Sequence, residues 1–204
     1  MWRPQLLLRT VFGLSALTVV ALVAPAAQAV PLVFTASLSG PSESPPNNSP
    51  GTGFAEVDFD IAAHSMRVVV DFSGLTSGTT ASHIHCCTTV PFSGTAIVAT
   101  TTPTFPGFPP GTSGHYDQTF NTTLASTYNS QFLALFGGSI AAAETALFNG
   151  LFAGTEYLNI HTSNFPGGEI RGFLEPVPEP ASLTLFAAAL AGLGLIRRRR
   201  RQQG

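Results

Sequence analysis

Polar and hydrophobic residues alternate along short segments between residues 30 and 176, and Gly, Pro, Ser and Asn separate these segments. Alternation with a period of two is typical of strands that are buried on one face. Residues 33–38 and 55–61 alternate in this way, and residues 66–72 form a β-branched run. Many short strands separated by turn signals predict a mainly β domain, an antiparallel Greek-key-like sandwich or barrel. Further strands are expected at Ile84, 96–98, 157–160 and 170–174.

The spacing of apolar residues becomes helical between residues 127 and 152. Gly137 and Gly138 divide this segment, and Ser139 is a suitable N-cap for its second half. The alanine run at 141–143 also favours a helix. We therefore expect two short helices that cover one side of the β domain. The apolar positions that carry the helical spacing are Phe132, Leu135, Phe136, Ile140, Leu147, Phe148 and Leu151.

Two segments are too rich in Pro, Gly, Ser, Thr and Asn for regular structure, namely residues 41–53 and 100–111. Such composition predicts loops. Phe105 and Phe108 lie in the second loop, where they either pack back onto the domain or face a partner.

The first 29 residues have the organisation of a secretory signal peptide. Arg3 and Arg9 supply the positive start, residues 11–23 are apolar, and residues 27–29 read Ala-Gln-Ala. A small-x-small sequence of this kind is a cleavage site. We expect export by the secretory pathway and cleavage after Ala29.

The C-terminal segment, residues 177–204, has a second apolar run. Residues 181–196 would span roughly 24 Å as a helix, which is enough to cross a bilayer with flanking anchors. Five arginines follow at 197–201. Clustered arginines stay on the cytoplasmic side, so we expect a transmembrane helix at about 181–196 and an outward-facing domain before it.

This tail resembles the PEP-CTERM sorting signal of Gram-negative bacteria, in which Pro178, Glu179 and Pro180 precede an apolar stretch and an arginine cluster. The resemblance implies an exosortase-type protease as a partner. It also implies removal of the tail and delivery from the inner membrane to the cell surface or extracellular matrix. Exopolysaccharide or matrix components are further partners that it suggests.

Charge is scarce and unevenly distributed in this chain. Charged residues make up 10% of the sequence, lysine is absent, and five of the nine arginines lie in the tail. The domain therefore has no basic face, and nucleic-acid binding requires clustered positive charge. We expect no nucleic-acid partner.

Four histidines are the best candidates for chemistry. His83 and His85 are two positions apart, so a strand would present both imidazoles on one face. Imidazole suits copper or zinc, and His161, with His115 as a fourth candidate, could complete the site. Alternatively, the histidines hold the strands in register by bonding Glu169, Thr162 or backbone carbonyls.

Cys86 and Cys87 are adjacent and are the only cysteines. In an oxidising compartment they could form a vicinal disulfide. Alternatively, they bind a metal beside the histidines, or one of them pairs with another molecule. Near the end of the domain, residues 166–171 read as a Gly-Gly turn followed by a strand that carries Arg171, either as a structural charge or as an anion-guiding charge near the histidines.

Several motifs resemble the CHRD domain, which takes its name from chordin. They are Ser-His-Ile-His at 82–85, Glu-Tyr-Leu-Asn-Ile-His-Thr at 156–162 and Phe-Pro-Gly-Gly-Glu-Ile-Arg-Gly at 165–172. The resemblance covers residues 32–175, and Cys86 and Cys87 replace a glycine-led turn of the family's pattern. The histidine layout is also similar to that of copper/zinc superoxide dismutase, which we interpret as shared architecture only.

These features favour a surface or matrix protein whose domain, residues 30–176, is a noncatalytic binding or structural module. The sequence contains no serine–histidine–acid set, no paired-carboxylate motif and no phosphate loop, so we do not expect an enzyme. The alternative is a copper- or zinc-binding protein, with weak superoxide dismutase-like redox activity, that uses the histidines.

Overall fold

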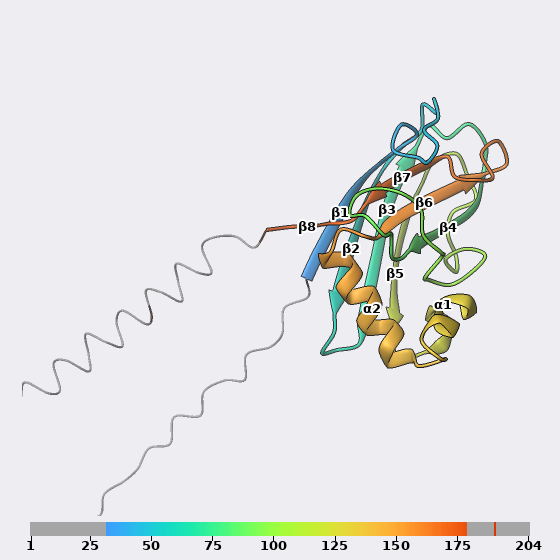
Figure 1. The fold of residues 1–204 in the computed structure, drawn as a ribbon. Helices are drawn as coiled ribbons and strands as arrows, with labels where there is room; N and C mark the ends of the chain where they lie inside the picture. Colours follow the sequence, from blue (N-terminus) through green and yellow to red (C-terminus); the bar gives the residue numbers. More distant parts are fainter. Residues whose placement is uncertain (1–31, 179–189, 191–204) are drawn as a thin grey trace, which may run out of the picture.

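A computed structural model describes residues 32–178 and Leu190. Within these residues eight strands form one curled antiparallel sheet (Figure 1) in the order β4-β6-β7-β1-β2-β3-β5, with β8 beside β1. The predicted mainly β, antiparallel fold is confirmed, but the strands form a single curled sheet rather than the two packed sheets of the expected Greek-key-like sandwich. The strands are β1 (Leu32–Ser39), β2 (Thr52–Asp60), β3 (Ser65–Ser73), β4 (Thr79–His85), β5 (Gly114–Asn121), β6 (Tyr157–Thr162), β7 (Ile170–Phe173) and β8 (Glu175–Pro176).

The concave face of the sheet carries the hydrophobic core. Phe34 on β1 is fully buried and lies opposite Val57 on β2, which in turn lies opposite Val68 on β3. Every second residue of these strands points to the same side, as the alternating sequence predicts. Burial of each such side chain stabilises the fold by about 1.5–3 kcal/mol.

Two short α-helices cover this core at one end of the sheet (Figure 1), as predicted: α1 (Ser130–Leu135) and α2 (Ile140–Phe152). Gly137 and Gly138 join them with φ angles of 63° and 80°, which glycine adopts without a steric penalty. The Ser139 side chain accepts a hydrogen bond from the Ala142 amide and so caps α2. Apolar rings of α2 pack on the sheet. The ring centres of Phe148 and Phe59 are 5.4 Å apart, and those of Phe152 and Phe34 are 5.2 Å apart.

The segment between β4 and β5 differs from expectation. Residues 96–98 do not form a strand, because among them only Val98 makes an isolated bridge, to His85. The loop that follows turns inward, and Phe105 is fully buried and stacks on Tyr116 of β5. The Phe105 amide also donates to the Ser82 carbonyl of β4. This loop therefore covers the opening between the two edge strands, and its phenylalanines belong to the domain rather than to a partner.

Three predicted features concern the chain ends. The signal peptide at 1–29 lies outside the described residues, as do Glu179, Pro180 and, apart from Leu190, the membrane helix expected at about 181–196. Within the part of the chain that is described, no helix has the length and apolar character needed to cross a membrane.

Candidate functional site

The convex face of the sheet carries a polar and aromatic layer opposite the core. His83, Asn159 and Arg171 lie side by side on β4, β6 and β7, because they are paired in register. Residues directly opposite each other in an antiparallel pair point to the same face. The neighbouring positions Ile84 and Leu158 point to the core instead and are fully buried.

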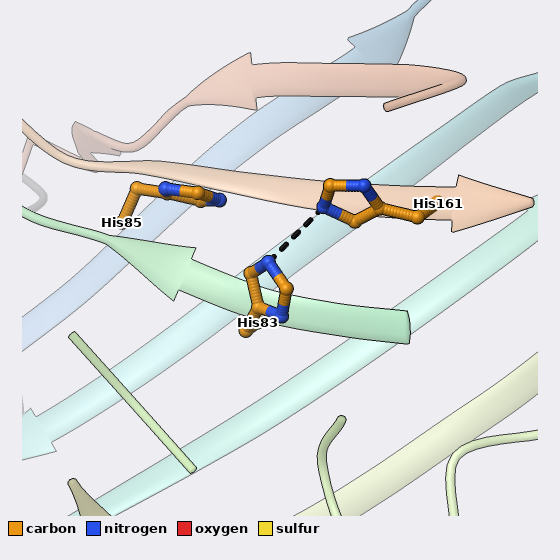
Figure 2. Close-up of side chains that lie close together, drawn as sticks. All are labelled: His83, His85 and His161. Atoms are coloured by element: carbon orange, nitrogen blue, oxygen red, sulfur yellow. Dashed lines mark hydrogen bonds between the residues drawn. The ribbon is translucent and has the colours of Figure 1, made fainter. Parts of the chain in front are cut away.

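Register brings three of the four candidate histidines together on this face. His83 and His85 come from β4 and His161 comes from β6 (Figure 2), and one ring nitrogen of each lies within 4.8 Å of the others. The closest pair is Nε2 of His83 and Nε2 of His161, at 3.0 Å. His161 reaches His83 because it lies opposite Ala81 on β4, which places it diagonally across from His83.

Each of these imidazoles is oriented by a backbone carbonyl. Nδ1 of His83 lies 3.3 Å from the Pro103 oxygen, Nδ1 of His85 lies 2.7 Å from the Ala96 oxygen, and Nδ1 of His161 lies 2.9 Å from the Pro166 oxygen. A carbonyl oxygen only accepts, so Nδ1 carries the proton in all three rings and Nε2 keeps its lone pair. This arrangement is the usual one for metal-binding histidines in proteins. The sequence left Glu169, Thr162 or backbone carbonyls as structural partners, and the histidines bond backbone carbonyls.

Burial keeps the cluster neutral. Desolvation, together with the neighbouring imidazoles of His85 and His161, lowers the pKa of His83 to about 3. Desolvation likewise lowers the pKa of His85 to about 4, and it lowers the pKa of His161. With neutral rings protonated on Nδ1, neither His83 nor His161 has a proton to place in their 3.0 Å contact. Two lone pairs face each other there, which is a position suited to a cation.

A buried arginine holds the surroundings of the cluster in place. Arg171 lies 4.7 Å from the centre of the Tyr157 ring, and Tyr157 stacks on His85 at 4.5 Å. The Arg171 guanidinium donates to the carbonyls of Ser42 and Gly94, at 2.5 and 3.0 Å, and so binds two loops to the sheet. Its counter-charge is Glu43, 3.9 Å away. Arg171 is thus a buried structural charge.

Glu169 and Thr162 bond each other rather than the histidines. The Glu169 carboxylate accepts hydrogen bonds from the hydroxyls of Thr162 and Ser49 and from the Thr76 amide. This buried carboxylate therefore joins the start of β7 to two loops and makes no hydrogen bond with the imidazoles.

His115 does not belong to the cluster, contrary to its place among the predicted ligands. It lies on β5, at the opposite edge of the sheet from β4, and its Nδ1 contacts Asp71 at 2.8 Å on the exposed surface. The sequence gives no register for an edge strand as polar as β5, so its separation from His83 could not be predicted.

Cys86 and Cys87 are joined by a disulfide at the end of β4. Cys86 belongs to the core and is 1% exposed, whereas Cys87 is exposed. The sulfurs lie on the side of β4 that faces α2, away from the imidazoles, and Glu156 is their acidic neighbour. Glu43 was not singled out from the sequence, and Glu156 and Tyr157 were named only as part of the motif at 156–162, because nothing local indicates that the two glutamates are buried.

Comparisons with known proteins identify two parts of the chain. A family model described as the CHRD domain matches residues 34–174, and one described as the PEP-CTERM protein-sorting motif matches residues 176–201. No curated protein and no solved structure matches significantly. The sorting motif implies an exported chain that an exosortase processes and sorts to the cell surface.

Proposed function

Since the chain belongs to the CHRD domain family and ends in a PEP-CTERM sorting motif, we propose that it is a noncatalytic surface protein whose domain binds one copper or zinc ion through His83, His85 and His161. The observation that carries the proposal is the convergence of three ring nitrogens within 4.8 Å, each ring oriented by a carbonyl at Nδ1.

The geometry suits these ions after a small closing movement. Copper and zinc bind imidazole nitrogen at about 2.0 Å, so two ligands of one ion are about 3.3 Å apart in a tetrahedral arrangement and about 4 Å apart on opposite sides of the ion. The widest nitrogen pair, at up to 4.8 Å, must therefore approach by about 1–1.5 Å. A cation between His83 and His161 would also replace their repulsive lone-pair contact by two favourable bonds.

The surface role follows from the sorting motif. We infer that the signal peptide and the tail after Pro180 are removed, and that the mature domain is delivered from the inner membrane to the surface or matrix of a Gram-negative cell. Exopolysaccharide and matrix components are the partners expected there. Binding, rather than catalysis, agrees with a sequence that has no nucleophile–base set or paired-carboxylate motif.

Metal analysis of the purified full-length chain tests the binding role. The protein is extracted in detergent, stripped with a chelator, re-equilibrated at neutral pH with copper or zinc, and freed of unbound ion. We expect one ion per chain, and nitrogen hyperfine coupling from imidazole in the copper(II) electron paramagnetic resonance spectrum. Retention of neither ion at neutral pH would refute the proposal.

A further inference from the structure

The Cys86–Cys87 disulfide lies beneath α2 against a carboxyl group that has no hydrogen-bond partner. Glu156 is 0% exposed, and neither of its carboxyl oxygens is bonded to any residue that the structure describes. A carboxyl oxygen and both sulfurs lie within 4.8 Å of one another. Burial raises the pKa of Glu156 well above its usual range. The group is therefore held as a neutral acid beside the disulfide.

Gly150 makes this close approach possible. It lies inside α2, where glycine is less favourable than alanine by about 1 kcal/mol. A Cβ atom at this position would lie 2.5 Å from Oε1 of Glu156 and 2.9 Å from Sγ of Cys86. Because Gly150 has no side chain, the Glu156 carboxyl group and the disulfide can pack against each other at this position.

The two sulfurs differ in their access to solvent. Cys87 is exposed, whereas Cys86 is 1% exposed and belongs to the core. A thiolate arriving from solvent can therefore reach Sγ of Cys87. Cleavage then releases the charge on Sγ of Cys86, where water does not solvate it, and an unsolvated thiolate is a poor leaving group. A proton supplied at that sulfur removes this obstacle.

We propose that Cys86 and Cys87 form a thiol–disulfide exchange site for an external dithiol, with Glu156 as the acid that protonates the departing sulfur of Cys86. In the first step the dithiol's thiolate bonds to Sγ of Cys87, the Cys86–Cys87 bond breaks, and its electron pair goes to Sγ of Cys86, which takes the proton of Glu156.

In the second step the other thiol of the reductant attacks its own sulfur in the mixed disulfide and releases Cys87, which takes a proton from water. Glu156 regains its proton from solvent. The protein disulfide is reduced by two electrons and the dithiol becomes a disulfide. The site lies on the α2 side of the sheet, but Cys86 directly follows His85, so the site is tested without a metal ion.

The position of the first attack is tested on the unaltered full-length chain, in detergent and with a chelator present. Excess glutathione forms the mixed disulfide, and iodoacetamide caps the thiol that is released. Fragmentation between residues 86 and 87 in tandem mass spectrometry then locates each group. We expect glutathione on Cys87 and the alkyl group on Cys86, and the reverse pattern would overturn the proposal.

The acid is tested by the rate of reduction with excess dithiothreitol. General acids contribute about 10²–10⁴-fold, so Glu156→Gln, which keeps the shape but holds no acidic proton, should react at least about tenfold more slowly. The matched control is Glu144→Gln, another buried acid, whose carboxylate bonds Thr122 and His64 instead. It should react at the wild-type rate. A folded Glu156→Gln protein, judged by circular dichroism, that reacts as fast as wild type would refute the role of Glu156.

Discussion

Nε2 of His83 and Nε2 of His161 lie 3.0 Å apart, although each ring has its Nδ1 at a backbone carbonyl. The two residues are 78 positions apart in the sequence and meet only because β4 and β6 are neighbours. Since neutral rings with this tautomer cannot donate across the gap, the contact is favourable only when a proton or a metal ion occupies it.

Replacement of any one of the three converging histidines should weaken copper or zinc binding. We expect His161→Gln, His83→Gln and His85→Gln each to raise the dissociation constant by at least about tenfold, because even loss of an outer-shell partner costs 10–100-fold. Isothermal titration of the chelator-stripped chain measures the effect. His115→Gln is the control, because its ring bonds Asp71 elsewhere, and an equal loss in this control would contradict the three-histidine site.

The metal-free domain should lose stability in acid through these histidines. The pKa of His83 is lowered to about 3 in the folded state, against 6.5 for an unperturbed histidine, so the unfolded chain binds the proton more readily. The contribution of His83 is thus fully present above pH 6.5 and is lost as pH falls from 6.5 towards 3, and the loss amounts to about 2 kcal/mol by pH 5.

Urea unfolding of the wild type and of His83→Gln at pH 7.5 and pH 5 measures this contribution, and the wild type should lose about 2 kcal/mol more than the variant. The difference between the two proteins is needed because Glu43 acts in the opposite direction. Burial raises its pKa to about 7, so its contribution is lost as pH rises from 4.5 to 7. Equal pH dependence of wild type and variant would contradict the assigned tautomer and burial.

Arg171 should contribute far more to stability than Arg67, although both form ion pairs. The Arg171 and Glu43 side chains are each 5% exposed, whereas the Arg67 side chain is 41% exposed. Arg171→Met leaves Glu43 buried without its counter-charge and should cost about 3–5 kcal/mol. Arg67→Met should cost no more than about 1 kcal/mol. Chemical denaturation of both variants compares them, and similar losses would argue against a buried charge at Arg171.

Gly150→Ala should destabilise the protein even though alanine favours helices. The added Cβ would lie 2.5 Å from Oε1 of Glu156, and overpacking of this kind costs about 1–3 kcal/mol. Gly167→Ala is the control, because its Cβ meets no atom within 4 Å. Thermal unfolding should show a lower midpoint for Gly150→Ala only. An unchanged midpoint would mean that the acid and the disulfide are not in close contact.

Processing should remove both ends of the chain in a host that contains an exosortase. Intact-mass measurement of the secreted product should give a protein that begins at Val30 and lacks most of the tail after Pro180. Replacement of Pro178, Glu179 and Pro180 by alanine should leave the tail in place and retain the protein in the membrane fraction. Unchanged release of this triple variant would contradict sorting through the motif.

Local pattern predicts much of this fold, because the buried face of each central strand repeats every second residue. The alternation in 33–38 and 55–61 predicts β1 and β2. Gly137, Gly138 and Ser139 mark the junction of α1 and α2. The strand β5 is not foreseen, because only Tyr116 of its eight residues is buried and no alternation results. Edge strands depend on their neighbour rather than on their own pattern.

The site is predictable only in part, because it depends on which strands pair with each other. Period-two geometry places His83 and His85 on one face, but whether His161 joins them depends on the pairing of β4 with β6. The burial of Glu156 and Arg171 arises from packing between segments far apart in the sequence. Charged residues are rarely buried, so nothing local could have marked these two.

The described domain begins and ends at paired strands, since Phe34 of β1 lies opposite Pro176 of β8. The sorting tail follows β8 directly, so until the tail is removed the domain is connected to it at this end of the sheet. The histidines lie at the level where β1 ends, because Ser39 pairs with Arg171, Arg171 with Asn159, and Asn159 with His83. Five residues of β1 separate that level from Phe34, which is about 17 Å at 3.3 Å per residue. A longer or shorter segment between β8 and the membrane would change how far the histidines lie from the membrane before processing and leave their arrangement unaltered.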